Sequence, residues 1–452
     1  MVEDYPCGQR LVESNAASVG ITSADAPEDQ AGKDADSITI GIVGAGQLAG
    51  MLAEAAETLG VRLYVQAAST DDPAVSRAHG VVIGAVDDVA ATRVLAGRAS
   101  VISFENEWVP LDALAALRAE GVTFLPDLDV LRPLVCKRRQ RELLDRLHLP
   151  APRWCPLEAV LIPPPTQPTE LNASSLAAPE PPDPLPPPPP VPRLPEGFRF
   201  PVMAKATTGG YDGRGIRPLA DQAELEAHLD AVPAEEWILE ELVAFEMELA
   251  LVACRDRDGS VVCYPLVQTH QHHQVCDWVL MPAPVDHAVA AFARNVAASL
   301  LTALDYVGVL TLEFFFGPAG LQVNELAPRT HNSGHLTIEA CRCSQFAQQV
   351  RIVAGLPMGL ADPLVAGALM INLLGFEHSR SDYAERRQAL RALPHAHLHW
   401  YSKPEASPGR KLGHLTVLLE GTTAEQRAGE RDRILEAVRR IWPLPADGNE
   451  SA

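Results

Sequence analysis

The chain has 452 residues, of which 47% are hydrophobic, and this length predicts two to four domains with buried cores rather than a disordered chain. Its 37 basic and 58 acidic residues give a net charge of −21. Proteins that bind nucleic acids or anionic membranes over a broad surface carry the opposite charge. Any phosphate group that this protein binds must therefore be held by a local site.

The eight cysteines are scattered, and no pair has the Cys-x-x-Cys spacing of a zinc or redox site. Free thiols in a reducing, cytoplasmic environment are the expected state. The N-terminus starts with acidic residues and lacks the apolar stretch of a signal peptide. No apolar run reaches the ~18 residues that a membrane-spanning helix needs. Secretion and membrane spanning are therefore not expected.

Residues 1–36 lack hydrophobic periodicity and are expected to form a disordered extension. The pattern then changes to a strand over 38–43, a tight turn over 44–46, an amphipathic helix and a second strand over 61–65. The segments VVIGA (81–85) and VISF (101–104) are typical of further buried parallel strands. This order of elements predicts an α/β domain with a parallel sheet.

A proline-rich insertion interrupts the middle of the chain, after a basic helix predicted over 137–147. Of the 39 prolines, 15 lie between Pro163 and Pro195. Proline fixes φ and lacks an N–H group, so polyproline II or a disordered loop is expected. An α+β pattern then runs from Phe200 to about residue 360. The smaller C-terminal part ends in a helix over 430–442 that is expected to bury Ile434, Leu435, Val438 and Ile441.

The segment Gly44-Ala-Gly46-Gln-Leu-Ala49 matches the glycine pattern of a dinucleotide-binding turn. Such a site needs a ribose-binding carboxylate about 20 residues later, at the end of the second strand. Gln66 occupies that position. A dinucleotide-dependent oxidoreductase is therefore the weaker alternative. The turn is better explained as a set of main-chain amides that bind another phosphate or carboxylate.

The segment PVMAKATTGGYDGRGI (201–216) is the strongest local signal for phosphate binding. A predicted strand delivers Lys205, and four glycines follow closely. Glycines allow main-chain amides to close over phosphate oxygens. Lys205 supplies a point charge, and Arg214 supplies a bidentate fork. The residue order of a P-loop is absent, and a flexible hairpin is the alternative interpretation.

A second signal is the predicted hairpin VGVLTLEFFFGPAGLQVNELAPR (307–329). A three-residue loop closed by Gly317 and Leu321 places Glu313 opposite Glu325, and Phe315 opposite Val323. Facing carboxylates repel each other unless a cation lies between them, and oxygen ligands favour Mg²⁺. The side chain of Asn324 could add a carbonyl oxygen. The alternative is a partly exposed strand pair without a metal.

A polar segment follows this hairpin and is expected to line a site rather than a core; it contains Arg329, His331, Asn332, Ser333 and His335. No nucleophile elbow surrounds Ser333, so a catalytic triad is not predicted. Two histidine clusters are expected on solvated or interface surfaces rather than at metal sites. They comprise His270, His272 and His273, and His395, His397 and His399, the latter three alternating on one face of a strand.

Taken together, these segments resemble the 5-(carboxyamino)imidazole ribonucleotide synthetases, which are ATP-grasp enzymes of purine biosynthesis. The resemblance spans about Ile38–Trp442, apart from the insertion, and is carried by GIVGAGQLAGML, SFENEWV, GGYDGRG, VNELAPRTHNSGH, SQF, HLHWYSK and PGRKLGH. It implies an α/β and α+β fold of ATP-grasp architecture. The expected parts are an extension (1–36), a Rossmann-like pre-ATP-grasp domain (37–133), a central ATP-grasp domain (134–360, with the insertion at 163–195) and a small C-terminal domain (361–452).

The resemblance also implies a reaction. ATP would phosphorylate bicarbonate to carboxyphosphate, and the amine of 5-aminoimidazole ribonucleotide would then be carboxylated, with release of ADP and phosphate. A homodimer that uses ATP and Mg²⁺ is implied, without nucleic-acid or membrane partners. Another ATP-grasp ligase acting on a ribonucleotide is the rival within the superfamily, and the C-terminal segment HWYSKPEASPGRKLGH argues against it.

The resemblance assigns roles residue by residue. The group expected to bind ATP comprises Lys137, Lys205, Gly210, Tyr211, Asp212, Gly213, Arg214, Gly215, Ile216, Glu240, Glu241, Leu242, Val243, Glu248, Gln271, Asn324 and Glu325. The expected metal ligands are Glu313 and Glu325, and the expected catalytic residues are Tyr211, Asp212, Arg214 and Arg329. The group expected at the substrate comprises Gln47, Glu105, Glu107, His331, Asn332, Ser333, Lys403, Arg410 and Lys411. Two positions depart from the family pattern. Lys137 replaces an expected arginine, and Gln271 replaces an expected histidine, although a shift of one residue would place His270 or His272 there.

Overall fold

The structure, a computed structural model, describes residues 38–162, 191–210 and 215–446. The predicted extension (1–36) and residues 163–190 of the predicted insertion lie outside these ranges. The described residues form two compact units. Among the described residues, the smaller unit lies within Pro152–Val243, and the larger unit combines residues 38–151 with residues 244–446.

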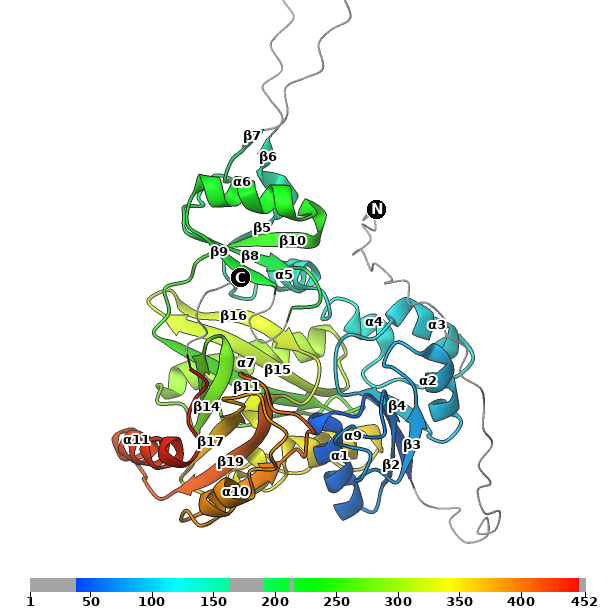
Figure 1. Cartoon of the computed structure of the whole chain (residues 1–452). Helices are drawn as coiled ribbons and strands as arrows, with labels where there is room; N and C mark the ends of the chain where they lie inside the picture. Colours follow the sequence, from blue (N-terminus) through cyan, green and yellow to red (C-terminus); the bar gives the residue numbers. More distant parts are fainter. Residues whose placement is uncertain (1–37, 163–190, 211–214, 447–452) are drawn as a thin grey trace, which may run out of the picture. The chain divides into compact units, whose positions relative to one another are not determined.

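The larger unit begins with a four-stranded parallel sheet in the order β3-β2-β1-β4. Its elements, blue to cyan in Figure 1, are β1 (Thr39–Val43), α1 (Gln47–Thr58), β2 (Arg62–Ala67), β3 (Gly80–Ile83), α2 (Val89–Ala96), β4 (Val101–Phe104), α3 (Leu111–Ala119) and α4 (Leu128–Leu131). Successive strand residues face opposite sides. Ile40 and Ile42 therefore pack with α1, whereas Val43 packs with α2 and α3. The predicted βαβ unit and its additional parallel strands are confirmed.

A nine-stranded sheet forms the centre of the larger unit, in the order β16-β15-β11-β13-β14-β17-β19-β18, with β12 paired to β11. The strands are β11 (Met247–Arg255), β12 (Val261–Cys263), β13 (Val267–His272), β14 (Val275–Met281), β15 (Gly308–Gly317), β16 (Gly320–Ala327), β17 (Gly367–Leu374), β18 (Ala396–Trp400) and β19 (Lys411–Leu419). Its helices include α5 (Lys137–Arg146), α7 (His287–Ala303), α8 (Thr337–Ala340) and α9 (Gln345–Val353).

Helices cover both faces of this sheet. Leu300 of α7 packs with Leu251 and Leu312 on one face. Ile352 of α9 packs with Val252 on the other face. Phe346 of α9 also joins the core between α1 and the parallel sheet. Helix α9 therefore contacts the cores of both sheets of the larger unit.

The C-terminal part extends the same sheet, because β17 pairs with β14 and β19 pairs with β17. Its helices are α10 (Ala384–Arg391) and α11 (Ala424–Ile441). The predicted C-terminal helix is confirmed but starts earlier, at a capping box formed by Thr423 and Gln426. Val438 is buried as predicted, and its three predicted partners are partly buried against the same core.

One prediction for this part is wrong. His395 has a φ of 55° and precedes β18, so it does not share the strand alternation of His397 and His399.

The smaller unit is a four-stranded sheet in the order β5-β10-β8-β9, with α6 packed on it (green in Figure 1). Its elements are β5 (Trp154–Pro156), a 3-10 turn (Leu157–Val160), β6 (Leu161–Ile162), β7 (Val191–Pro192), β8 (Val202–Ala206), β9 (Ile216–Leu219), α6 (Gln222–Ala231), a second 3-10 turn (Ala234–Glu236) and β10 (Trp237–Glu241). Leu225 of α6 packs with Val202, Ala204 and Leu239.

The predicted insertion is shorter than 163–195, because its last residues belong to the fold. β7 pairs with β6, where Leu161 lies opposite Pro192 and Ile162 lies opposite Val191. The carbonyl of Pro192 also accepts a hydrogen bond of 2.8 Å from Gln222 Nε2. A proline can take this place because its carbonyl still accepts although it has no N–H to donate.

Deletion of residues 165–188 is expected to leave the thermal unfolding midpoint unchanged within about 2 °C, because the β6–β7 pair is kept and a shorter loop closes more readily. Deletion of 165–192 removes β7 as well and is the matched control, with a lower midpoint expected. Thermal unfolding followed by circular dichroism measures both. Equal midpoints for the two deletions would contradict a stabilising role for β7.

The domain boundaries predicted at 133/134 and 360/361 do not coincide with the division into compact units. Both proposed boundaries lie within the larger unit, and the nine-stranded sheet crosses the second one. The parts 37–133, 134–360 and 361–452 remain our proposal for the domains.

Candidate functional site

Two carboxylates face each other on adjacent strands of the larger unit. Glu313 of β15 pairs directly with Glu325 of β16, as predicted. The loop that produces this register differs from the predicted loop. Gly317 pairs with Gly320 across a two-residue loop, and Phe315 lies opposite Gln322 rather than Val323. Asn324 is an extra residue between the pairs Phe314–Val323 and Glu313–Glu325, and this bulge restores the predicted pairing of the glutamates.

Cationic and polar side chains surround this carboxylate pair. Lys137 Nζ lies 2.6 Å from Glu325 Oε1, and His331 Nε2 lies 3.1 Å from Glu313 Oε1. Burial raises the pKa of Glu313, but the hydrogen bond from His331 and the charges of Lys137 and Lys411 outweigh it, so the net pKa lies below the ordinary value. Lys411 therefore acts on this site electrostatically, from the start of β19. These cations allow two like charges to face each other.

The helix α5 anchors the strand that carries Glu325. Lys137, Gln140 and Arg141 lie on one helical face, at i, i+3 and i+4. Gln140 Nε2 donates to the Leu326 carbonyl at 2.9 Å, and Gln140 Oε1 accepts from the Leu326 N–H at 3.1 Å. Arg141 donates to the main-chain carbonyl of Asn324 at 2.6 Å. Sequence reasoning missed Gln140 and Arg141, although their spacing from Lys137 was a usable signal.

Arg329, predicted as catalytic, forms a two-pronged ion pair with Glu107. Its Nε lies 2.5 Å from Glu107 Oε2, and its Nη2 lies 3.2 Å from Glu107 Oε1. Burial raises the pKa of Glu107, yet the Arg329 charge and hydrogen bond reverse this, and the net pKa is lowered. The structure thus brings a residue of the parallel-sheet region, Glu107, to the polar segment that follows β16.

The glycine-rich turn is occupied by a carboxylate of the chain itself. Glu105 Oε1 accepts from the Gly46 N–H at 2.5 Å, and Glu105 Oε2 accepts from the Ala49 N–H at 2.8 Å. A Cβ on Gly44 would lie 2.5 Å from the Glu105 side chain, so glycine is required there. Burial raises the pKa of Glu105, against these two hydrogen bonds. The turn therefore presents its amides to a carboxylate, and Gln47 follows it as the first residue of α1.

Gln66, at the position where a dinucleotide site needs a ribose-binding carboxylate, is tied to the core by hydrogen bonds. Its side chain is fully buried, donates to the Ala85 and Asp88 carbonyls at 2.5 and 3.1 Å, and accepts from Thr92 Oγ1 at 2.8 Å. These bonds give Gln66 a structural role between β2 and α2. The position where a ribose-binding carboxylate is needed is thus filled by an amide tied to the core.

The polar segment after β16 folds into a tight loop with a short 3-10 turn, Asn332–Gly334. His331 Nδ1 lies 2.9 Å from Ser333 Oγ, and Ser333 itself is buried. Asn332 and Asn372 exchange side-chain amide hydrogen bonds of 3.0 and 2.7 Å. Asn372, in β17, is a partner that sequence reasoning missed, because no local pattern marks a buried asparagine in an apolar strand.

Two other predicted substrate residues lie in the segment before β19. Arg410 is exposed, and its Nη1 donates to the Glu405 carbonyl at 2.9 Å. Lys403 Nζ lies 5.8 Å from the centre of the Tyr401 ring. Both therefore have contacts within their own segment, and their roles at the substrate remain predictions.

Glu248 lies in β11, two residues before Ala250, which pairs with Glu313. Glu248 and Glu313 therefore share one face of the sheet. His270, beside Gln271, lies close enough for its charge to act on Glu248. The β13–β14 ladder shifts register between His270 and Gln271. Which of these two side chains contacts a nucleotide stays a prediction.

Stability is expected to depend on pH through Glu248. Burial and then the charge of Glu313 raise the pKa of Glu248 from 4.5 to about 7. Because the folded pKa exceeds the unfolded one, protonated Glu248 stabilises the fold below about pH 4.5, and this contribution is lost as the pH rises through about 7. Glu248→Gln should flatten the pH dependence of the free energy of unfolding in urea between these values. The exposed neighbour variant Glu246→Gln is the control, and an unchanged slope in Glu248→Gln would contradict the account.

The smaller unit holds a buried ion pair. Lys205 Nζ lies 2.7 Å from Glu240 Oε2, with side chains only 8% and 2% exposed. Strand β8 carries Lys205 between Ile216 of β9 and Ile238 of β10. Gly215 has a φ of 71°, which favours glycine. The residues Tyr211, Asp212, Gly213 and Arg214 lie outside the described ranges, so their predicted roles are not described by the structure.

The residues predicted for the adenine side follow β8 and β9 in the same unit. Glu240 is buried, and Glu241 Oε1 accepts from the Arg153 N–H at 3.1 Å. Leu242 is 48% exposed, and Val243 is the last residue of the unit. An exposed leucine next to a strand end offers an apolar surface for a base. The role of Leu242 on the adenine side stays a prediction.

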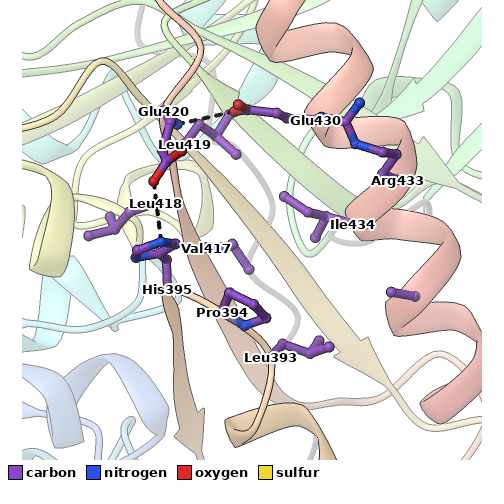
Figure 2. Close-up of a pocket in the computed structure, with 11 residues that line it drawn as sticks. Leu393, Pro394, His395, Val417, Leu418, Leu419, Glu420, Glu430, Arg433 and Ile434 are labelled. Carbon is purple, nitrogen blue, oxygen red and sulfur yellow. Dashed lines mark hydrogen bonds and ion pairs between the residues drawn. The ribbon is translucent and has the colours of Figure 1, made fainter.

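The charged residues described above do not line the pocket shown in Figure 2. That pocket, of about 350 Å³, lies between α11 and the ends of β18 and β19, and is lined by Leu393, Pro394, His395, Val417, Leu418, Leu419, Glu420, Glu430, Arg433, Ile434 and Ala437. Of the predicted site residues, none is in this lining. Its polar contacts are the ion pair of His395 with Glu420 at 3.4 Å and the hydrogen bond from the Glu420 N–H to Glu430 at 3.2 Å, which Figure 2 marks with dashed lines.

Comparison with protein families places three matches along the chain. A ribonucleotide synthetase pre-ATP-grasp domain matches residues 37–133, an ATP-grasp domain matches 191–346, and a phosphoribosylaminoimidazole carboxylase C-terminal domain matches 368–428. A curated relative from Synechococcus elongatus, named N5-carboxyaminoimidazole ribonucleotide synthase, is 44% identical over 90% of this chain and 96% of its own length. The chain belongs to the N5-carboxyaminoimidazole ribonucleotide synthase family.

Solved structures of this synthase family share the fold. The N5-carboxyaminoimidazole ribonucleotide synthetase of Thermus thermophilus is 30% identical, with a TM-score of 0.72 over 91% of this chain and 100% of that chain. A synthase from Aspergillus clavatus, in complex with ADP and 5-aminoimidazole ribonucleotide, is 28% identical, with a TM-score of 0.73 over 90% of this chain and 99% of that chain. The predicted fold class, with pre-ATP-grasp, ATP-grasp and C-terminal parts, is confirmed.

Two further observations concern what the described residues lack. No helix within 38–162, 191–210 and 215–446 is both long and apolar enough to cross a membrane. In the same ranges, no group of three or more His, Cys, Asp or Glu side chains is arranged to hold a metal ion.

Proposed function

We propose that this chain carboxylates 5-aminoimidazole ribonucleotide with bicarbonate and ATP, to give 5-(carboxyamino)imidazole ribonucleotide, ADP and phosphate. The observation that carries the proposal is the pair Glu313–Glu325 with Lys137, His331 and Lys411 around it, in a chain of this synthase family. Family members are ATP-dependent ligases, and the relative from Aspergillus clavatus binds ADP and 5-aminoimidazole ribonucleotide.

The reaction balances in two steps. A bicarbonate oxygen attacks the γ-phosphorus of ATP, and the bond to ADP breaks, which forms carboxyphosphate. The amine nitrogen of the ribonucleotide then attacks the carboxyl carbon, the carbon–oxygen bond to phosphate breaks, and the amine loses a proton. Because carboxyphosphate is anionic and short-lived in water, its stabilisation requires positive charge and exclusion of solvent. The cationic side chains Arg329 and Lys411 suit the first requirement.

We assign magnesium to Glu313 and Glu325 within this proposal. Mg²⁺ commonly takes one or two protein carboxylates together with substrate phosphates and water. Two facing carboxylates fit that pattern. Bound there, the ion supplies positive charge to phosphate oxygens. Lys137 and His331 each contact one oxygen of these two carboxylates, and they would orient the carboxylates toward the ion.

We assign Lys205 to the phosphates of ATP, together with the loop from Gly210 to Ile216. Glu240 holds the Lys205 ammonium group in place by a 2.7 Å contact. A lysine acts as a point charge toward phosphate, and its orientation then matters less than its location. Arg329 and His331 are assigned to bicarbonate and ribonucleotide, respectively. The remaining predicted ATP and substrate residues keep their assignments as part of this proposal.

A homodimer in a reducing, cytoplasmic compartment completes the proposal. All seven cysteines within the described ranges are free thiols, as expected for such a compartment. The homodimer rests on the resemblance alone. Sedimentation equilibrium of the full chain tests it, with twice the mass of 48.6 kDa expected.

Incorporation of labelled bicarbonate tests the proposed reaction. Purified protein with ATP, Mg²⁺, 5-aminoimidazole ribonucleotide and ¹³C-bicarbonate should form a ribonucleotide carbamate that carries one label, detected by NMR before it decomposes. The rival ligase on another ribonucleotide would give no label in this nucleotide. The match of residues 368–428 to a phosphoribosylaminoimidazole carboxylase C-terminal domain favours the first outcome.

A further inference from the structure

The Ser344-Gln345-Phe346 segment starts helix α9, and the proposed reaction gives it no role. Gln345 is fully buried, and its side-chain amide forms hydrogen bonds with both main-chain polar groups of His331, which we call the bracket. Its Oε1 accepts from the His331 N–H at 3.0 Å, and its Nε2 donates to the His331 carbonyl at 2.6 Å. Burying an amide is unfavourable unless both ends are hydrogen-bonded, and these two bonds satisfy both ends.

His331 in turn contacts Glu313, one of the two facing carboxylates. His331 Nδ1 accepts from the Ser333 N–H at 3.3 Å, so Nδ1 is the unprotonated nitrogen. The proton then lies on Nε2, which is 3.1 Å from Glu313 Oε1 and donates to it. The direction of the imidazole is therefore set from the main chain of the loop, and the Gln345 amide holds that main chain.

Neighbouring contacts fix the Gln345 amide itself. Thr337 Oγ1 accepts from the Gln345 N–H at 3.0 Å and donates to the Gly334 carbonyl at 2.6 Å. A Cβ on Gly334 would lie 2.5 Å from Gln345 Oε1, so the amide fills the space beside this glycine. The ring of Phe346 lies 5.5 Å from that of His335. The loop from His331 to His335 is thus held by α9 at several points.

We propose that Gln345 is a positioning residue for the carboxylate site: it fixes the main chain of His331 so that the imidazole reaches Glu313. This inference rests on the proposed function, because it assigns the site to catalysis. Gln345 acts through His331 and touches neither Glu313 nor Glu325 in the structure. Displacement of a positioned group by about 1 Å can cost about 100-fold in rate, so loss of the bracket has a measurable effect.

Gln348 provides a matched control on the same helix. It is also fully buried, and its side-chain amide brackets another main chain in the same way. Its Oε1 accepts from the Gly359 N–H at 2.8 Å, and its Nε2 donates to the Gly359 carbonyl at 3.1 Å. Gly359 is not one of the predicted site residues. Loss of either amide should therefore destabilise the fold similarly, while only one loss should affect the site.

A double-mutant cycle tests the inference through kcat. Gln345→Met keeps the side-chain length and removes both hydrogen bonds, and it should lower kcat by about tenfold or more, whereas Gln348→Met should change kcat by less than about twofold. In a His331→Ala background, Gln345→Met should cause little further loss, because its effect passes through His331. A full, additive loss in that background, or an equal loss of kcat in both methionine variants, would overturn the inference.

A binding measurement keeps the test independent of turnover. Calorimetry should show that Mg²⁺ tightens ADP binding less in Gln345→Met and His331→Ala than in the wild type and in Gln348→Met. Gln345→Glu keeps one oxygen acceptor for the His331 N–H, so its Mg²⁺ effect should be reduced less than that of Gln345→Met. It replaces Gln345→Met in this test if the methionine variant does not fold. Equal Mg²⁺ effects in all variants would overturn the inference. A wild type that binds Mg²⁺ and ADP but does not carboxylate the ribonucleotide would instead refute the proposed function alone.

Discussion

Glu325→Gln is expected to lower kcat by a factor of about 100 to 1,000 while the protein remains folded. The substitution keeps the shape of the side chain and removes the charge that faces Glu313 across β15 and β16. Glu325 acts through the magnesium ion assigned to it, and loss of a single group that stabilises developing charge in a transition state costs about 100- to 1,000-fold in other enzymes. The fold should survive, because the substitution keeps the volume of the side chain and the Glu325 side chain is partly exposed, at 34%.

The measurement is ADP formation at saturating ATP, over a range of Mg²⁺ concentrations, together with circular dichroism. Asp305→Asn is the control, because Asp305 pairs with Arg255 at 2.6 Å but is 85% exposed and lies outside the predicted site. Normal turnover in Glu325→Gln, at ordinary Mg²⁺ concentrations, would refute the paired-carboxylate site.

Lys205→Met is expected to damage both stability and catalysis. Removal of one partner of a buried ion pair typically costs about 3–5 kcal/mol, and Glu240 is only 1% exposed. The same substitution removes the charge assigned to the phosphates of ATP. The double variant Lys205→Met/Glu240→Gln replaces the whole pair by uncharged side chains and should regain most of the lost stability.

The double variant separates the two effects. Its thermal unfolding midpoint should approach that of the wild type, whereas its ATP turnover should remain as low as in Lys205→Met. Recovery of turnover along with stability would show that Lys205 has a structural role only. Failure of the double variant to regain stability would show that the buried charge of Glu240 is not the cause of the instability.

The sequence predicted the elements whose signals are local. Alternation and helical spacing placed the βαβ unit from Thr39 to Ala67, and turn residues placed the hairpin that pairs Glu313 with Glu325. The predicted loop was nevertheless wrong by one residue, and the bulge at Asn324 compensated for it. A bulge depends on the residues that a strand packs against, which here are Gln140 and Arg141 of α5. The residues of the hairpin alone therefore do not predict it.

Long-range polar contacts could not be predicted in the same way. The glycine pattern after β1 indicated exposed amides, yet their partner, Glu105, comes from the end of β4. Gln345 belongs to a motif that supports the family resemblance, but its contact with His331 depends on how the loop after β16 meets α9. Residues 163–195 were assigned to an insertion from composition alone, which cannot show that Val191 and Pro192 pair with β6.

Dependence of ADP release on 5-aminoimidazole ribonucleotide tests the central claim most directly, because it examines substrate, cofactor and reaction type together. The full chain is incubated with ATP, Mg²⁺ and bicarbonate, and ADP is measured with and without the ribonucleotide. We expect the full rate only when the ribonucleotide and bicarbonate are both present, with one ADP formed for each nucleotide carboxylated. Equal ADP release with and without the ribonucleotide would contradict the account.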